Sequence, residues 1–430
     1  MIRQEKTVSG YKETETLMID GGKPLSGRVA PDGAKNSSLY ALIAATFINE
    51  GWMTIENVPL ITDIKMTLGI LDELGMQYKV QGTTVKVYGK ITNTIISDKY
   101  ASKIRSSTTF LGALLSQFPE VILPLPGGDK IGDRPIDIHI SVMEAYGASI
   151  SIEGGFIKAS LDTSQLTGKD IHLRYPSVGA TINAIFMAIT AQGQSTITNA
   201  AREPEIVDLI SLLGKMGAVI HGGGTNRIVI NGVRKLTSTT HDIMPDRLET
   251  GALMMCFAMT GGKGSVYGSI PEHNEPLIHL LRSIGIQVDI EGDTIHIDAH
   301  QPSKSFHIET QPYPGLATDL QAICTSLALK CPGTSTIKDT VFEERFGHIE
   351  ELRRMGARIE RNGNKIFIHN GDHITGSRVE GGDIRSVVSL ILVALSIKDK
   401  SYIGGIEHLL RGHVNFVNKI IQLEADAEFI

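Results

Sequence analysis

The stretch LDELGMQYKVQGTTVKVYG, Leu71–Gly89, holds the end of an amphipathic helix, a glycine, and two alternating strands joined by a glycine turn. The same order recurs four more times along the chain. The copies are VMEAYGASISIEGGFIKAS (Val142–Ser160), LLGKMGAVIHGGGTNRIVINGV (Leu212–Val233), LLRSIGIQVDIEGDTIHIDA (Leu280–Ala299) and LRRMGARIERNGNKIFIHNG (Leu352–Gly371). Their cap glycines are Gly75, Gly147, Gly217, Gly285 and Gly356, at a spacing of roughly 70 residues.

A truncated sixth copy, KIIQLEADAEFI (Lys419–Ile430), ends the printed sequence and reads Leu423-Glu424-Ala425 where the others have glycine. Helices expected at 38–48, 181–191 and 386–397 are apolar nearly all round, which is typical of buried helices. The repeats therefore predict an α/β fold, a two-lobe inverse α/β barrel of six repeated units, three per lobe, with buried helices. A solenoid of six units is the weaker interpretation, because the period is too long for the common helical arrays.

The bulk composition indicates a soluble globular protein of at least two domains. The chain has 430 residues, with 41% hydrophobic and 20% charged residues. A net charge of −6 gives no general reason to bind nucleic acid or a membrane surface. Any anionic ligand must therefore be held by local arginine and lysine side chains.

The cysteines and the N-terminal residues indicate a cytoplasmic protein without a metal site. Cys256, Cys324 and Cys331 lie in or beside apolar runs and show no metal-ligand spacing. The N-terminal segment is polar and lacks the apolar region of a signal peptide, and no run is long enough to span a membrane. We expect no metal and no cofactor.

The segment LPGGDKIGDRPIDIHI, Leu125–Ile140, places two glycines, carboxylates and an arginine within a short distance. Taken alone, it is equally typical of a surface turn. Other motifs in the chain favour a functional loop over a surface turn.

Several motifs together resemble one family, the UDP-N-acetylglucosamine 1-carboxyvinyltransferases, which are enolpyruvyl transferases. They run in order from about Thr16 to the C-terminus. The motifs are GAKNSSLYALIAA (Gly33–Ala45), LPGGDKIGDRPIDIHI, SVGATINAIFMA (Ser177–Ala188), NAAREPEIVDL (Asn199–Leu209), PDRLETGA, YPGLATDLQA, TVFEERFGHIEELRRMGA and DIRSVVSLILVAL. The related enzyme that acts on shikimate phosphate typically has Ser-Lys-Ser where this chain has Ala34-Lys35-Asn36. The resemblance to that enzyme therefore ranks below the resemblance to the UDP-N-acetylglucosamine 1-carboxyvinyltransferases.

The resemblance implies a division into lobes and a reaction. One expected lobe is 34–244, which contains the catalytic loop. The other is discontinuous and consists of 14–33 and 245–430. Residues 1–13 are an expected N-terminal extension, and the hinge strands are expected near Gly33 and Met244. The family moves the enolpyruvyl group of phosphoenolpyruvate to the 3-hydroxyl of UDP-N-acetylglucosamine and releases phosphate. Those two molecules are the expected partners; the oligomeric state is left open.

The reaction brings two anions together and needs an acid and a base, which explains the residue types that the resemblance assigns. The expected catalytic residues are Asp129 (acid), Asp319 (base), Lys35 and Arg411. The expected substrate contacts are Lys35, Asn36, Arg105, Arg134, Pro135, Ile136, Asp137, Ile138, Ser177, Val178, Gly179, Asp319, Val341, Arg385 and Arg411.

Several of these residues also have ordinary structural interpretations. Asp319 is suited to cap a helix at 320–329, and both roles are compatible. Ser177 opens a helix whose amides suit a diphosphate. His348 is interpreted as a packing residue, and Gly222–Gly224 as a hairpin turn.

Some positions depart from the family pattern. Asp129 stands where most members have a cysteine, which the epoxide antibiotic fosfomycin alkylates, so we expect resistance. Leu410, His413 and Val414 depart from the usual Asp-Arg-Gly-Tyr-Glu motif around Arg411. Two alternative functions follow: a diverged paralogue that transfers enolpyruvate to another nucleotide or sugar, and a catalytically silent nucleotide-sugar-binding protein.

Overall fold

The computed structural model describes residues 15–127, 136–371 and 373–430. The chain divides into two compact units. Unit 1 contains the N-terminal segment up to Asp32, Pro245–Gln311 and Gly315–Ile430. Unit 2 contains Gly33–Met244 together with Pro312–Pro314.

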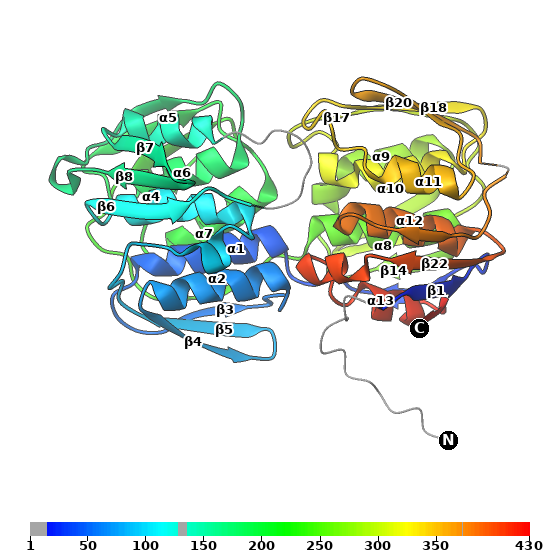
Figure 1. The fold of residues 1–430 in the computed structure, drawn as a ribbon, viewed down its shortest axis with the longest axis horizontal. Helices are drawn as coiled ribbons and strands as arrows, with labels where there is room; N and C mark the ends of the chain where they lie inside the picture. The colour runs from blue at the N-terminus through cyan, green and yellow to red at the C-terminus, as the bar shows by residue number, and fades with distance from the viewer. Residues whose placement is uncertain (1–14, 128–135, 372) are drawn as a thin grey trace. The chain divides into compact units, whose positions relative to one another are not determined.

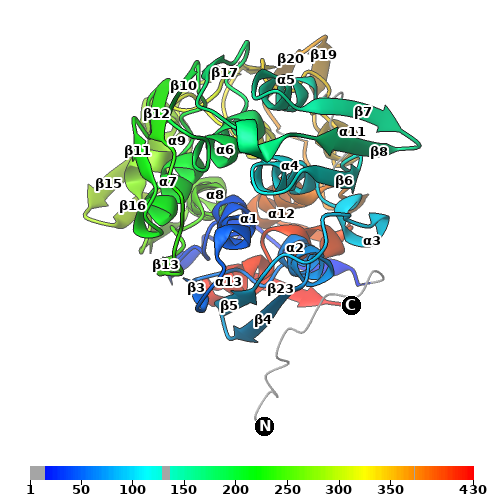
Figure 2. The same ribbon diagram turned by 90° about the vertical axis from the view of Figure 1, so that its left-hand side faces the viewer.

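Unit 2 contains three separate sheets in its described residues (Figures 1 and 2). Their strand orders are β13-β3-β5-β4, β6-β8-β7 and β11-β12-β10-β9. The strands are β3 (Met53–Glu56), β4 (Met76–Gln81), β5 (Thr84–Gly89), β6 (Glu120–Pro124), β7 (Ser149–Glu153), β8 (Phe156–Ser160), β9 (Asp170–His172), β10 (Gln194–Thr198), β11 (Val219–His221), β12 (Arg227–Asn231) and β13 (Thr240–Asp242). The helices are α1 (Lys35–Ala44), α2 (Thr62–Glu73), α3 (Asp98–Ala101), α4 (Thr109–Leu115), α5 (Asp137–Ala145), α6 (Val178–Ala188) and α7 (Pro204–Lys215).

Unit 1 repeats this arrangement with the sheets β15-β16-β14-β2, β17-β18-β20-β19 and β21-β22-β1-β23. Its strands are β1 (Leu17–Asp20), β2 (Ser26–Val29), β14 (Lys263–Val266), β15 (Gln287–Glu291), β16 (Thr294–Asp298), β17 (His307–Thr310), β18 (Thr334–Asp339), β19 (Ile359–Asn362), β20 (Lys365–His369), β21 (Arg378–Glu380), β22 (Lys400–Gly404) and β23 (Asp426–Phe429). Its helices are α8 (Arg247–Thr260), α9 (Glu275–Ser283), α10 (Gln321–Ala328), α11 (His348–Arg354), α12 (Ile384–Ser396) and α13 (Phe416–Gln422).

One strand pattern underlies all six sheets. In five sheets a parallel edge pair is followed by two antiparallel pairings; β17 runs parallel to β18, which pairs antiparallel with β20, which pairs antiparallel with β19. In the three-stranded sheet a single parallel bridge, Ile95 to Ile122, stands in place of the edge strand. The predicted α/β fold with three repeats in each half is therefore confirmed. The sheets of each unit stay separate instead of joining edge to edge, so neither unit is a closed barrel.

The inner helices are buried as their composition predicts. Every residue from Ala180 to Ala188 of α6 and from Ser386 to Leu395 of α12 is buried. In Figure 2, α1, α4 and α6 run through the middle of unit 2 with its sheets around them. The helices begin earlier than predicted, at Lys35, Val178 and Ile384. The first turns of α1 and α12 contain polar residues and that of α6 contains Gly179, so the apolar pattern does not extend to their starts.

The repeat glycines have the conformation that their position at helix ends requires. Gly75, Gly147, Gly217, Gly285 and Gly356 all have φ between 95° and 105°, in a region that favours glycine. The turn at Gly222–Gly224 joins β11 to β12 as an antiparallel hairpin, as predicted.

Candidate active site

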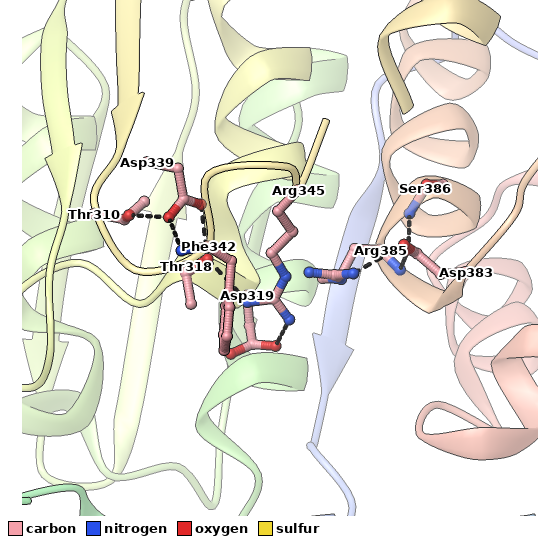
Figure 3. A network of polar contacts seen from close by, with 9 residues as sticks. All are labelled: Thr310, Thr318, Asp319, Asp339, Phe342, Arg345, Asp383, Arg385 and Ser386. Carbon is pink, nitrogen blue, oxygen red and sulfur yellow. Dashed lines mark hydrogen bonds and ion pairs between the residues drawn. The ribbon is translucent and has the colours of Figure 1, made fainter. Parts of the chain in front are cut away.

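Asp319, the predicted base, is held by an arginine within unit 1. It lies in the 3-10 helix η5, Thr318–Leu320, which precedes α10. The Arg345 guanidinium donates from Nη2 to Asp319 Oδ1 at 2.6 Å and from Nη1 to Thr318 Oγ1 at 2.9 Å (Figure 3). The Asp319 side chain keeps 38% of its surface exposed, whereas that of Arg345 keeps 8%. The carboxylate is thus oriented by a buried cation and still open on one side.

Asp319 does not cap a helix, so that structural interpretation is wrong. Helix α10 begins at Gln321 after Leu320, without a side-chain cap hydrogen bond. Asp319 lies within the 3-10 turn that leads into α10, and the N-cap position of α10 is Leu320. Its carboxylate accepts a hydrogen bond from the Arg345 guanidinium instead.

Asp339 at the end of β18 organises the loop around Asp319. Its fully buried carboxylate accepts hydrogen bonds from Thr310 Oγ1 at 2.8 Å and Thr318 Oγ1 at 2.7 Å. It also accepts from the amides of Val341 and Phe342 at 3.0 and 2.9 Å. Because four donors converge on this one group, the η5 loop and the loop after β18 are fixed together. Val341, predicted to contact substrate through its backbone, is held by this group.

Arg345 is the residue that the sequence predictions missed. It lies in the VFEERF motif, which precedes α11. Its guanidinium lies over the ring of Phe342, 5.1 Å from the ring centroid. The motif pointed to this loop, but no local pattern indicated that Arg345 reaches Asp319.

Arg385 lies on α12, whose N-cap is Asp383. Asp383 Oδ1 accepts from the amides of Arg385 and Ser386, both at 2.9 Å, and its Oδ2 accepts from Arg385 Nη2 at 2.8 Å. The guanidinium points towards Arg345 in Figure 3. Arg345 Nε and Arg385 Nη1 are buried and have no hydrogen-bond partner in the described structure. Two cations that face each other in this way favour an anion between them.

Arg411 ends the 3-10 helix η6, Ile406–Arg411, and is partly buried. Leu410, His413 and Val414, which depart from the family motif, surround it in the sequence. The ring of His413 packs at 6.1 Å from that of Phe416, at the start of α13.

Lys35 and Asn36 open α1 in unit 2. Lys35 Nζ lies 2.6 Å from Oδ2 of Asp63, a buried residue in the first turn of α2. The Lys35 side chain keeps 19% of its surface exposed. A lysine held in this way by a buried carboxylate is oriented before any ligand arrives.

The remaining predicted contacts in unit 2 lie at the beginnings of helical segments. Arg105 opens the 3-10 helix η2, Arg105–Thr108. Ile136, Asp137 and Ile138 begin α5, and the Asp137 carboxylate contacts the Arg174 guanidinium. Asp129, Arg134 and Pro135 lie outside the described residues.

Ser177 is the N-cap of α6, as predicted, and its hydroxyl accepts from the amide of Ala180 at 3.3 Å. Val178 and Gly179 form the first turn of that helix. This N-terminus presents backbone amides, as an anion site requires.

His348 is a packing residue, which confirms its predicted role. It is 2% exposed, and its Nε2 lies 3.1 Å from Thr325 Oγ1. Burial lowers the pKa of this imidazole to about 3, so it stays neutral at ordinary pH. The three cysteines are buried in packed surroundings, also as predicted.

In residues 15–127, 136–371 and 373–430, no cluster of three or more His, Cys, Asp or Glu side chains could hold a metal ion. Over the same residues, no helix combines the length and the apolar character that crossing a membrane requires.

Comparisons with known proteins agree over nearly the whole chain. A family model described as EPSP synthase (3-phosphoshikimate 1-carboxyvinyltransferase) matches residues 19–420. UDP-N-acetylglucosamine 1-carboxyvinyltransferase 2 of Streptococcus mutans serotype c is 38% identical over 425 residues, which cover 96% of this chain and 99% of that protein. UDP-N-acetylglucosamine 1-carboxyvinyltransferase 1 of Streptococcus agalactiae serotype V is similar to the same extent, again 38% over 425 residues with coverage of 96% and 99%.

Solved structures show the same fold at lower identity. The enolpyruvyl transferase NikO from Streptomyces tendae superposes with a TM-score of 0.85 at 22% identity, over 96% of this chain and 99% of that one. EPSP synthase from Acinetobacter baumannii superposes with a TM-score of 0.72 at 18% identity, over 97% and 100% of the two chains.

Proposed function

This chain belongs to the enolpyruvyl (1-carboxyvinyl) transferase family, and from that premise we propose that it transfers the enolpyruvyl group of phosphoenolpyruvate to the 3-hydroxyl of UDP-N-acetylglucosamine, releasing phosphate. This would make it the enzyme of the first committed step of peptidoglycan synthesis. The acceptor is taken from the relatives that are 38% identical over 96% of the chain.

The observation that carries the proposal is the group formed by Asp319, Arg345 and Arg385. An addition–elimination needs a base for the sugar hydroxyl and cations for the carboxylate and phosphate of phosphoenolpyruvate. In unit 1 the partly exposed Asp319 carboxylate is paired to Arg345, and the Arg385 guanidinium points towards Arg345 (Figure 3). A silent binding protein has no need of an oriented carboxylate beside two converging cations.

In the proposed reaction, Asp319 takes the proton of the 3-hydroxyl while the sugar oxygen forms a bond to C2 of phosphoenolpyruvate. C3 gains a proton, which the resemblance assigns to Asp129 as the donor. In the reverse proton step the Asp129 carboxylate takes a proton back from C3, the C2–O bond to phosphate breaks, and the enol ether forms as phosphate departs. Arg345, Arg385, Arg411 and Lys35 neutralise the anionic groups throughout these steps.

The test is phosphate release from phosphoenolpyruvate with UDP-N-acetylglucosamine, compared with UMP and other nucleotides. We expect turnover with UDP-N-acetylglucosamine, and Asp319→Asn should lower it by at least about a hundredfold while nucleotide-sugar binding persists. Asp298→Asn, which removes a partly exposed carboxylate paired to Lys263, serves as the control and should leave turnover unchanged. Turnover with another acceptor only would indicate the diverged paralogue suggested by Leu410, His413 and Val414.

Resistance to fosfomycin is a second consequence of the proposal. A carboxylic acid at position 129 is a much weaker nucleophile towards an epoxide than a thiolate. We expect the wild type to keep its activity after preincubation with fosfomycin and UDP-N-acetylglucosamine, whereas Asp129→Cys should lose activity with time. Mass spectrometry of the adduct checks the position. Rapid inactivation of the wild type would contradict the assignment of Asp129.

A further inference from the structure

We propose that His139 is a positioning residue that fixes the two predicted nucleotide-sugar segments, 136–138 and 177–179, against each other. The inference rests on the proposed function, because that function makes these segments part of a binding site. His139 follows the first segment on α5, and its side chain is buried, with 7% exposure. It belongs to no predicted site and takes no part in the proposed chemistry.

Asn183 determines which atoms of the His139 ring donate and accept. Its carboxamide is fully buried on α6, and Oδ1 accepts from the Gly112 amide at 2.9 Å. Its Nδ2 therefore carries the hydrogens, and it donates to Thr108 O at 3.1 Å and to His139 Nδ1 at 2.8 Å. Since an amide nitrogen has no lone pair to offer, Nδ1 must accept, and the imidazole is the neutral tautomer protonated on Nε2. One side chain thus joins α4, α5 and α6.

The other edge of the ring lies against Gly179. A methyl group on Gly179 would lie 2.6 Å from His139 Cε1 and 3.0 Å from Nε2, which is too close for the ring to stay in place. Gly179 lies in the first turn of α6 and its backbone does not need glycine, so glycine here costs helix stability relative to alanine. The close approach of the imidazole explains why a glycine is needed.

The two contacts have a common result. Nδ1 anchors the ring to Asn183, inside α6, and the Cε1–Nε2 edge sets the distance from α5 to the first turn of the same helix. The N-termini of α5 and α6 carry the predicted contacts Ile136, Asp137 and Ser177–Gly179. The spacing of these two N-termini should therefore determine how well a nucleotide sugar fits both.

A double-mutant cycle tests the inference, with His139→Ala, Gly179→Ala and the double variant. Calorimetry gives the Kd for UDP-N-acetylglucosamine, and steady-state assays give kcat and both KM values. Each single variant should raise the Kd and KM for UDP-N-acetylglucosamine about tenfold, a difference of about 1.4 kcal/mol. The KM for phosphoenolpyruvate and kcat should change little. In the double variant Gly179→Ala should add almost nothing, because the ring that it would strike is gone.

Tyr146→Phe is the matched control. Tyr146 caps the opposite end of α5 and donates to Ser195 Oγ at 3.1 Å, so the variant also loses one buried hydrogen bond. It should lower the melting temperature without changing the Kd. Additive effects in the cycle, or unchanged Kd values in both single variants, would overturn the inference alone. A wild type that does not bind UDP-N-acetylglucosamine would overturn the proposed function, and this inference with it.

Discussion

Glu424 replaces a glycine in the sixth repeat and still adopts the glycine conformation. Its φ is 72°, close to the region that the five repeat glycines occupy. A side chain in this region costs about 1–2 kcal/mol. The side-chain contacts of Glu424 do little to offset that cost, because both its salt bridge to Lys23 at 3.5 Å and its hydrogen bond from Ser26 Oγ at 3.2 Å are exposed to solvent. The fold imposes the conformation here against the preference of the residue.

Glu424→Gly should therefore stabilise the protein by up to about 1 kcal/mol, since the greater freedom of glycine in the unfolded chain offsets part of the gain. Thermal or urea unfolding measures the difference. The reverse change, Gly217→Ala, is the control: φ is 105° and no atom lies within 4 Å of the added methyl, so only the backbone opposes it. We expect that variant to be destabilised. A destabilised Glu424→Gly would show that the side-chain contacts of Glu424 outweigh the strain.

At the scale of elements, α8 and α13 meet through a buried group of charges. Lys419 Nζ on α13 lies 2.7 Å from Glu249 Oε1 on α8 and 2.9 Å from Asp32 Oδ1. Glu249 Oε2 also accepts from the Asp32 amide at 2.5 Å. Asp246 caps α8, and its amide donates to Asp32 O at 2.8 Å. The segment that ends at Asp32 and the segment that begins α8 are therefore held together here.

Burial raises the pKa of Glu249 from 4.5 to about 7, because loss of hydration outweighs the attraction of Lys419. Below pH 4.5 the group is protonated in both folded and unfolded states, so it adds no pH dependence and its stabilising contribution is fully present. Between pH 4.5 and 7 the folded state binds more protons, so stability falls as the pH rises. A difference of 7 − 4.5 = 2.5 pH units corresponds to a loss of about 3 kcal/mol across this range.

Glu249→Gln should remove this part of the pH dependence, which unfolding curves at several pH values between 4.5 and 7.5 measure. Glu309→Gln is the control, since Glu309 is an exposed partner of Lys338 and should leave the slope as in the wild type. Equal slopes in the wild type and Glu249→Gln would contradict the raised pKa.

At the scale of the whole molecule, the predicted contacts divide between the two units. Lys35, Arg105 and Ser177 belong to unit 2, and Asp319 and Arg385 belong to unit 1. The family resemblance implies that both sets serve one pair of substrates and that the two lobes close over them. We therefore expect small-angle scattering to show a smaller radius of gyration at saturating UDP-N-acetylglucosamine. Glucose at the same concentration is the control, and an unchanged radius with bound nucleotide sugar would contradict closure.

The sequence by itself determined the repeat, the buried helices and the glycine ends, because each depends on spacing along a few turns of chain. A helix that is apolar all round must be buried wherever it lies, and a hydrophobic pattern of period two marks a strand without knowledge of its neighbour. For the same reason, Ser177 as a cap, the hairpin at Gly222–Gly224 and the packing role of His348 could be predicted.

Only the tertiary structure decided which side chains meet. Asp319 has the local features of a cap, but its partner Arg345 comes from a loop after another strand. The contacts of His139 with Asn183 and Gly179 join two helices, and the pairing of Lys35 with Asp63 joins two others. Such contacts arise from how elements pack, and the periodicity within one element carries no information about its neighbour. Glu424 shows the same limit. Glutamate does not favour a positive φ, and the packing of the sixth repeat imposes one.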